Sequence, residues 1–397
     1  MERLKRLSIN AARRTSTDFK RYLYDSINWD RQLIGITGAR GSGKTIMLLQ
    51  HLKYLLETKN NALYVSLDDV FFAETKLVYF AEDFVKYGGT HLLLDEVHKY
   101  LNWSQELKNI SDNLPELKVV FTSSSALEIH KGSHDLSRRA IMHNLPGLSL
   151  REYLKLKYQI ILPKFSLKQI IDDTDKITSA VLNKIKPLPI FNEYLKEGYY
   201  PYFLDTESDY LKQLISSLNL VLEGDLPAIH KIDFSSIIKL KNLLNIISRI
   251  VPFKPNIEKL ARQTNTSRET LLKYLYYLDK AQIIQWLGSN TNGINYLNKP
   301  DKIFLGNTNI AYALSGEQAD KGNIRETFFL NQLTVNHAVT YPKTGDFMVD
   351  NKYLFEVGGK SKTQKQIAGI ENSFIVADDI EYGFGNKIPL WLFGFMY

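Results

Sequence analysis

The apolar positions in the first 125 residues form short runs that alternate with longer amphipathic segments. Four runs rich in β-forming residues predict strands at 31–37, 61–67, 91–95 and 117–125. After the first run, IMLLQHLKYLLE (46–57) has apolar positions at helical spacing. HLLLD (91–95) is apolar without alternation, which is typical of a strand buried on both faces. Strands that alternate with helices in this way predict a parallel α/β sheet.

The pattern changes after about residue 150. Residues 151–235 are mostly helical in pattern, with proline breaks. Residues 256–287 predict two helices and a strand, with Ser267 as the N-cap of the second helix. The Gly/Asn-rich stretch GSNTNG (288–293) suits the tip of a β-hairpin, and a third α/β region follows from about residue 300.

The composition is that of a folded protein, with 44% apolar and 23% charged residues over 397 positions. This length predicts two or three domains. The absence of cysteine excludes disulfides and thiolate metal sites. No apolar run approaches the roughly 18 residues of a membrane span, and the start lacks the apolar stretch of a signal peptide. We therefore expect a cytoplasmic protein with no membrane partner.

The net charge of +7 leaves two interpretations open. An excess of positive charge favours acidic partners such as nucleic acid or nucleotide phosphates. Alternatively, the lysines are simply spread over solvated faces. The N-terminal arm is the exception, because its basic residues outnumber the two acidic ones, Glu2 and Asp18; they are Arg3, Lys5, Arg6, Arg13, Arg14, Lys20 and Arg21.

The chemistry begins in the turn between the first predicted strand and its helix, where GARGSGKT matches G-x-x-x-x-G-K-[ST]. Glycines let this loop curl so that its N–H groups face phosphates, and the helix N-terminus adds partial positive charge. Lys44 is expected on the β and γ phosphates of ATP, and Thr45 on Mg²⁺. The complete set of predicted nucleotide-binding residues is Gly38, Ala39, Arg40, Gly41, Ser42, Gly43, Lys44 and Thr45.

A second acidic motif follows about 50 residues later, in HLLLDE (91–96). The buried strand is expected to present Asp95 beside the phosphate loop, where its carboxylate can hold Mg²⁺. Glu96 is the candidate base for the attacking water. Ser123–Ser125 follow the next strand and can place a polar group near the γ-phosphate, or simply cap a helix.

These motifs occur in a recognisable order. ITGARGSGKT, LLLDEVHK, FTSSSALEI, DLSRRA…LPGLSLREYL and EVGGK make the chain resemble AAA+-type bacterial and archaeal ATP-binding proteins. Members of that family carry a C-terminal domain of unknown function with a restriction-endonuclease-like fold. The resemblance implies an α/β P-loop NTPase domain, a helical and winged-helix middle and a C-terminal α/β domain. It also implies a polar sensor at Ser123 and an arginine finger at Arg139, preceded here by Arg138 instead of the usual glycine.

The C-terminal region resembles a PD-(D/E)xK nuclease core. The matching residues are Glu326 in a predicted helix, Asp346, Glu356 and Lys360. A nuclease of that class uses its acids to hold magnesium and its lysine to steady the attacking water. Here the last pair is E-x-x-x-K, two residues longer than E-x-K, which moves Lys360 by about 6–7 Å along a strand. We expect a retained fold with lost or weakened cleavage.

From these observations we predict five parts. They are a basic arm (1–20), a P-loop AAA+-like domain (21–150), a helical lid or linker (151–235), a winged-helix-like domain (236–300) and a PD-(D/E)xK-like domain (301–397).

The expected function is Mg²⁺-dependent ATP binding and hydrolysis coupled to the C-terminal domains. One alternative is an ATP-gated nucleic-acid-processing protein with a live nuclease centre, and another is a non-hydrolysing adaptor. Nucleic acid bound through the winged helix or the C-terminal domain, a protein partner and a second copy of the chain are the candidate partners.

Overall fold

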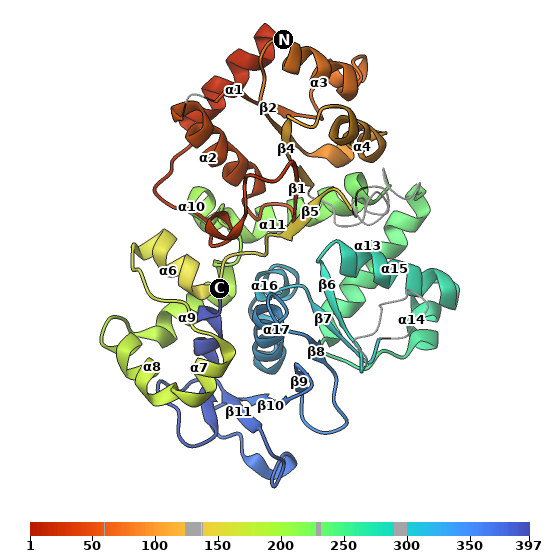
Figure 1. Ribbon diagram of the computed structural model, residues 1–397. Helices are drawn as coiled ribbons and strands as arrows, with labels where there is room; N and C mark the ends of the chain where they lie inside the picture. The colour runs from red at the N-terminus through yellow and green to blue at the C-terminus, as the bar shows by residue number, and fades with distance from the viewer. Residues whose placement is uncertain (59, 124–135, 137, 228–231, 290–299) are drawn as a thin grey trace. The chain divides into compact units, whose positions relative to one another are not determined.

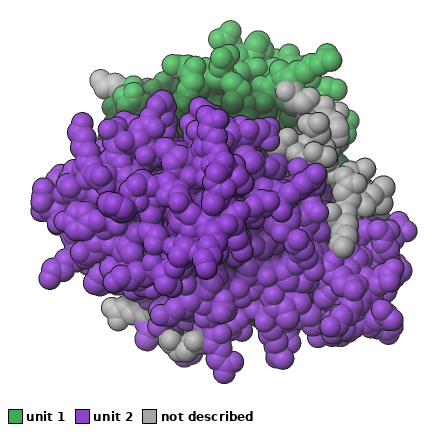
Figure 2. All heavy atoms as spheres, turned by 90° about the horizontal axis from the view of Figure 1, so that it is seen from below, with its two compact units in different colours: residues 1–147 green, residues 148–397 purple. Residues whose placement is uncertain are grey.

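The computed structural model describes residues 1–397 except 59, 124–135, 137, 228–231 and 290–299 (Figure 1). The chain divides into two compact units, residues 1–147 and 148–397, which Figure 2 colours separately. Within the described residues, no helix has both the length and the apolar character needed to cross a membrane.

The first unit is built on a five-stranded parallel sheet with the order β2-β3-β4-β1-β5. The predicted parallel sheet is thus confirmed. Its fifth strand was not predicted, because IMHN is short and its side chains are mostly exposed. The strands are β1 Leu33–Thr37, β2 Ala62–Ser66, β3 His91–Asp95, β4 Lys118–Ser123 and β5 Ile141–Asn144.

Helices cover both faces of this sheet. Successive strand residues point to opposite sides, and the strands carry apolar side chains on both sides, so both faces have to be covered. Leu93 packs in one core with helix α2, whereas Leu92 and Leu94 pack in the other with α3 and α4. These helices are α2 Lys44–Glu57, α3 Leu77–Lys86 and α4 Trp103–Asn113, and short 3₁₀ turns lie at Tyr24–Ser26, Val70–Ala73 and Val97–Lys99.

The basic N-terminal stretch forms a helix, α1 Glu2–Arg14, in the first unit. Leu4, Ser8 and Ala12 are its buried positions. The Ser8 hydroxyl accepts a hydrogen bond from the backbone N–H of Tyr64 at 3.0 Å, which ties α1 to strand β2. Its basic residues therefore lie on a helix that is packed against the sheet.

The second unit begins with a helical region, as predicted. Serines start two of its helices with reciprocal capping boxes, Ser149 with Glu152 and Ser166 with Gln169. The helices are α6 Leu150–Tyr158, α7 Leu167–Asp172, α8 Thr174–Leu182, α9 Pro187–Glu197, α10 Phe203–Thr206, α11 Tyr210–Leu220 and α13 Phe234–Ile250, with a π-helical turn at Val221–Asp225.

Two helices and a hairpin follow. Ser267 caps the second helix as predicted, because its hydroxyl accepts a hydrogen bond from the Thr270 N–H at 3.1 Å. The predicted hairpin tip at 288–293 lies mostly outside the described residues. The elements are α14 Ile257–Gln263, α15 Arg268–Lys280 and the antiparallel pair β6 Ile284–Leu287 and β7 Lys302–Leu305, followed by α16 Thr308–Ser315.

The chain ends in the predicted C-terminal α/β region. Its sheet has the order β12-β11-β10-β9-β8, antiparallel from β8 to β10 and parallel from β10 to β12. The elements are α17 Lys321–Leu333, β8 Val339–Thr340, β9 Phe347–Val349, β10 Tyr353–Gly358, β11 Ser373–Ala377 and β12 Lys387–Pro389, with a 3₁₀ segment at Leu390–Phe395.

Candidate nucleotide site

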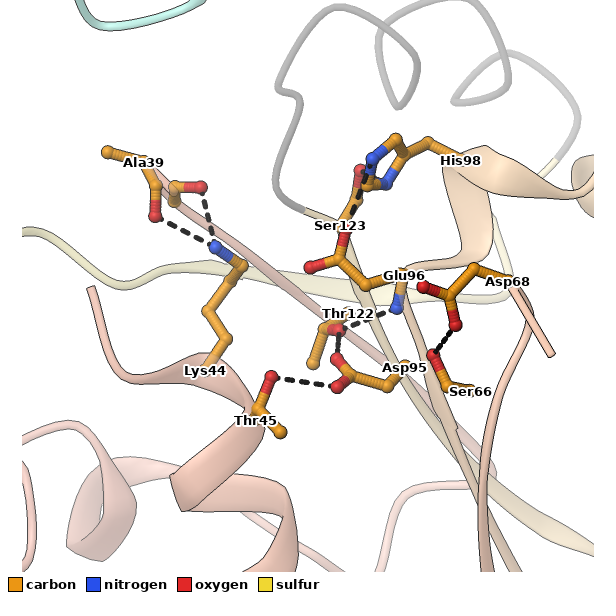
Figure 3. A network of polar contacts seen from close by, with 11 residues as sticks. Ala39, Lys44, Thr45, Ser66, Asp68, Asp95, Glu96, His98, Thr122 and Ser123 are labelled. Carbon is orange, nitrogen blue, oxygen red and sulfur yellow. Dashed lines mark hydrogen bonds and ion pairs between the residues drawn. The ribbon is translucent and has the colours of Figure 1, made fainter. Parts of the chain in front are cut away.

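The loop between β1 and α2 has the curled backbone that its glycines predict. Gly38, Gly41 and Gly43 all have positive φ angles, of 152°, 83° and 97°. At Gly38, a Cβ atom would lie 2.3 Å from the carbonyl oxygen of Leu145, so only glycine fits there. The Lys44 ammonium lies over the loop and donates to the carbonyl oxygens of Gly38 and Ala39, both at 2.9 Å (Figure 3).

A buried arginine supports the same loop. Arg21 donates to the carbonyl oxygen of Ser42 at 2.5 Å and to those of Pro146 and Gly147 at 2.8 Å. The sequence pattern counted Arg21 only among basic residues near the N-terminus, because nothing in the local sequence shows that it reaches residues 21 and 125 positions away. Arg21 therefore connects the phosphate loop to the segment that follows β5.

Asp95 lies at the centre of a network of hydroxyl groups (Figure 3). Its buried carboxylate accepts hydrogen bonds from Thr45 at 2.7 Å, from Tyr64 at 2.9 Å and from Thr122. Burial and the negative charge of Asp95 raise the pKa of the Tyr64 hydroxyl, so this group stays protonated and able to donate. The sequence prediction missed both Tyr64, in the middle of β2, and Thr122, next to the carboxyl end of β4; these two strands flank β3.

Glu96 follows in a constrained turn. Its φ angle is +54°, and its backbone N–H donates to the Thr122 hydroxyl at 3.2 Å. The Glu96 carboxylate lies 3.2 Å from Nε2 of His98. The other ring nitrogen of His98, Nδ1, lies 3.1 Å from the hydroxyl of Ser123 (Figure 3). Sequence reasoning selected Glu96 and Ser123 but missed the histidine between them.

The remaining candidates of this unit lie apart from this network. Arg139 forms a bidentate ion pair with Asp112 of α4, at 2.6 and 3.0 Å, whereas Arg138 is exposed. Ser124 and Ser125 lie outside the described residues. Of the three predicted serines, Ser123 is thus the one that the structure describes.

The donor set of this site fits a magnesium–nucleotide complex. The Thr45 hydroxyl and the Asp95 carboxylate are oxygen ligands of the kind that Mg²⁺ prefers. The hydroxyl of Ser42 in the loop is fully buried and has no hydrogen-bond partner among the described residues. A buried polar atom of this kind normally has a partner, and a phosphate oxygen would provide one.

Comparison with known families decides the nature of this unit. Residues 30–154 match the family model AAA_14, described as an AAA domain. Most of the first unit is therefore similar to an AAA domain. Residues 188–321 match a second model, a domain of unknown function named DUF8612. A search of curated proteins gave no match.

This chain is also similar to several solved structures. The Walker-type ATPase PABY2304 of Pyrococcus abyssi is 12% identical, with a TM-score of 0.42, over 75% of this chain and 95% of its own. The RuvB Holliday junction branch migration motor of Thermotoga maritima is 14% identical, with a TM-score of 0.32, over 70% and 93%. AMPPCP-bound DnaA from Aquifex aeolicus is 14% identical, with a TM-score of 0.26, over 70% and 88%.

The predicted C-terminal acidic residues come close enough to influence one another. Burial raises the pKa of Glu326 and of Glu356, and the negative charge of Asp346 raises both further. Two lysines balance these charges: Lys302 pairs with Glu326, and Lys362 pairs with Glu356 at 2.6 Å. Within the described parts of the chain, no group of three or more histidine or acidic side chains is placed to hold a metal ion.

The structure pairs a different lysine from the predicted one with Glu356. Lys360 is exposed, and its backbone carbonyl accepts a hydrogen bond from Lys387 at 3.0 Å. The lysine that reaches Glu356 is Lys362, two residues further on. Strand β10 ends at Gly358, so the strand spacing used to place Lys360 no longer applies beyond that residue. Gly358 lies directly against the Lys362 side chain, where a Cβ atom would come within 2.7 Å of it.

Proposed function

We propose that this protein binds ATP with Mg²⁺ and hydrolyses it, and that its nucleotide state acts on the second unit. The hydrogen bond between Thr45 and Asp95 carries the proposal, because it brings the two expected magnesium ligands together beside the phosphate loop. The magnesium ion, when bound, would neutralise charge on the β and γ phosphates.

Each residue of the site then has a defined task. The backbone N–H groups of the glycine-rich loop and the helix N-terminus bind the phosphates. Lys44 places its positive charge on the β and γ phosphates, where negative charge is greatest. Glu96 orients a water molecule and accepts its proton as the water attacks the γ-phosphate. Ser123, at the carboxyl end of β4, is the candidate sensor of that phosphate.

Steady-state ATPase activity of the full chain tests this proposal. Lys44→Ala and Glu96→Gln should each abolish turnover, whereas the exposed control variants Lys76→Ala and Glu82→Gln should keep it. Nucleotide binding should be lost in Lys44→Ala and retained in Glu96→Gln, because only the first variant removes a group that binds phosphate. If the wild-type protein binds ATP but hydrolyses it no faster than Glu96→Gln does, the proposal of hydrolysis is overturned. The non-hydrolysing adaptor is then the function that remains.

The arginine finger remains part of the proposal. Arg139 is the candidate, in cis or on a neighbouring copy, and it would have to leave Asp112 to reach a phosphate. Mixing Arg139→Ala with Lys44→Ala tests action between copies. Recovery of turnover in the mixture would show that one chain supplies Arg139 to the other.

Nucleic acid is the partner we propose for the second unit. Lys254 and Arg268 line a hollow of about 410 Å³ around the start of α14, and this pairing of positive side chains fits a phosphate backbone. The tyrosines of α15 are a weaker indication, because Tyr274 and Tyr277 are buried in the helix packing. A live nuclease centre has less support, since Lys302 and Lys362 already balance Glu326 and Glu356.

A further inference from the structure

We infer that His98 positions Glu96 and couples it to Ser123, so that the base and the end of β4 move as one unit. This inference rests on the proposed hydrolysis at the same site. It adds a positioning residue that neither the motifs nor the family match assigns.

The first support is the contact at each ring nitrogen. Nε2 of His98 lies 3.2 Å from the Glu96 carboxylate, and Nδ1 lies 3.1 Å from the Ser123 hydroxyl. Packing alone requires neither contact, because a buried apolar side chain would fill the same space. The imidazole ring is rigid, so a displacement at one nitrogen is transmitted directly to the other.

The chemistry of the three groups assigns the direction of both hydrogen bonds. An ionised carboxylate can only accept, so Nε2 of His98 must carry the hydrogen that Glu96 receives. In the neutral ring Nδ1 is then an acceptor, and the Ser123 hydroxyl donates to it. The chain Ser123 to His98 to Glu96 therefore runs in one direction and holds a single tautomer.

The surroundings leave the Glu96 side chain as the movable part. Its backbone is fixed, because the N–H donates to Thr122 and the residue occupies the left-handed region. Val97 is fully buried and anchors the short turn Val97–Lys99 that carries His98. The His98 side chain is 2% exposed, whereas that of Glu96 is 21% exposed. A buried, fixed ring thus holds a carboxylate that reaches solvent.

The functional consequence follows from the position of Ser123. This residue ends β4, the strand between β3 and β1, and its hydroxyl is buried in the same network. A shift of Ser123 toward a γ-phosphate would lengthen or break its hydrogen bond to Nδ1 of His98. The ring would then move, and the hydrogen bond from Nε2 to the Glu96 carboxylate would change. The orientation of the base Glu96 therefore depends, through His98, on whether Ser123 contacts the γ-phosphate.

Amide substitutions separate the two hydrogen bonds. In His98→Gln the side-chain amide lies near the position that Nε2 occupies in wild type, so a donor for Glu96 is kept. In His98→Asn the amide lies near the position of Nδ1, so a partner for Ser123 is kept. We expect His98→Ala and His98→Asn to lower kcat for ATP by about 10-fold or more, as removal of a supporting hydrogen bond at such a site commonly does. His98→Gln should retain kcat within about threefold. KM for ATP should change little in all three, because Lys44 and the phosphate loop, which are proposed to hold the nucleotide, are unchanged in these variants.

A double variant tests whether His98 and Ser123 act together. Adding His98→Ala to Ser123→Ala should lower kcat by less than the product of the two separate effects, since both substitutions remove the same hydrogen bond. Equal kcat in wild type, His98→Ala and His98→Asn would overturn the inference while leaving hydrolysis intact. A parallel rise of KM in all three single variants would also overturn it, because that pattern indicates structural damage.

A measurement without turnover keeps the inference separate from the proposed function. Long-range ¹H–¹⁵N NMR of the histidine rings should show His98 as the Nε2–H tautomer in the full chain. Its ring ¹⁵N shifts should change in both Glu96→Gln and Ser123→Ala. A His98 ring in the Nδ1–H form, or one insensitive to both substitutions, would overturn the relay even if the protein hydrolyses ATP.

Discussion

The Thr45 hydroxyl donates to the Asp95 carboxylate across 2.7 Å, joining residues 50 positions apart in the chain. Thr45 lies in the first turn of α2, and Asp95 is the last residue of β3. Parallel strands bring their carboxyl ends to one edge of the sheet, and the phosphate loop follows one of those ends. The hydrogen bond therefore results from strand order, and it is the geometric basis of the proposed magnesium site.

Tyr64 should tune this magnesium site. Its hydroxyl donates to the same Asp95 oxygen as Thr45, so Tyr64→Phe removes one of the groups that orient the carboxylate. We expect the Mg²⁺ concentration for half-maximal ATP turnover to rise about 10-fold, as is common when a group behind a metal ligand is removed. Titration of ATPase activity with Mg²⁺ checks this. The exposed Tyr87→Phe is the matched control, and equal Mg²⁺ dependence of both variants would contradict the prediction.

Lys362 and Lys360 form a matched pair for a measurement of protein stability. Glu356 is 1% exposed and pairs with Lys362, so Lys362→Met leaves a buried carboxylate without its counter-charge. We expect the free energy of unfolding to fall by about 1–3 kcal/mol. Lys360→Met should change it by less than about 0.5 kcal/mol, because that side chain is exposed. Urea unfolding measures both, and equal losses of stability would show that Lys360 contributes as much as Lys362.

The carboxyl group of Asp279 should make the stability of the folded protein depend on pH. Burial raises the pKa of this carboxyl group to about 6. The positive charge of Lys280 and the backbone N–H of Trp286, which donates to the carboxylate at 2.8 Å, act in the opposite direction and lower the pKa. The folded chain thus holds this proton more tightly than the unfolded chain does. The resulting stability is fully present below about pH 4 and is lost as the pH rises through about 6.

Asp279→Asn should therefore stabilise the protein at neutral pH, because asparagine keeps the acceptor for Trp286 and carries no charge to bury. The expected gain is on the order of 3 kcal/mol at pH 7.5, and it should vanish near pH 4. Thermal unfolding at both pH values measures it, with the exposed Asp205→Asn as control. A gain that is the same at both pH values would rule out Asp279 as the titrating group.

Nucleic-acid binding by the second unit should depend on Lys254 and Arg268. The double variant Lys254→Gln/Arg268→Gln should weaken binding of duplex DNA and reduce the slope of log affinity against log salt by about 1–2, one unit for each phosphate that is no longer neutralised. Fluorescence anisotropy with a labelled duplex measures this across salt concentrations. Lys176→Gln, exposed on α8 of the same unit, is the control. An unchanged slope would show that this hollow does not bind the phosphate backbone.

The sequence alone determined the parts of the molecule that local patterns encode. Four of the five strands of the first sheet, helix α2, the glycine-rich loop and the cap at Ser267 all follow from apolar periodicity or from the backbone needs of particular residues. Gly38 illustrates this, because its positive φ and the nearby Leu145 oxygen admit no side chain. Spacing between motifs was also sufficient to select Lys44, Thr45, Asp95 and Glu96.

Tertiary structure decided which side chains surround those residues. No motif assigns a role to Tyr64, Thr122 or His98. The order of strands β2, β3 and β4 brings Tyr64 and Thr122 to Asp95, and it brings His98, which follows β3, to Ser123 at the end of β4. Tertiary structure also decided which lysine pairs with Glu356. Strand β10 ends at Gly358, and Lys362, beyond that end, reaches the carboxylate. Local periodicity specifies which face of an element is buried, but contacts between elements depend on how the chain returns to the same place.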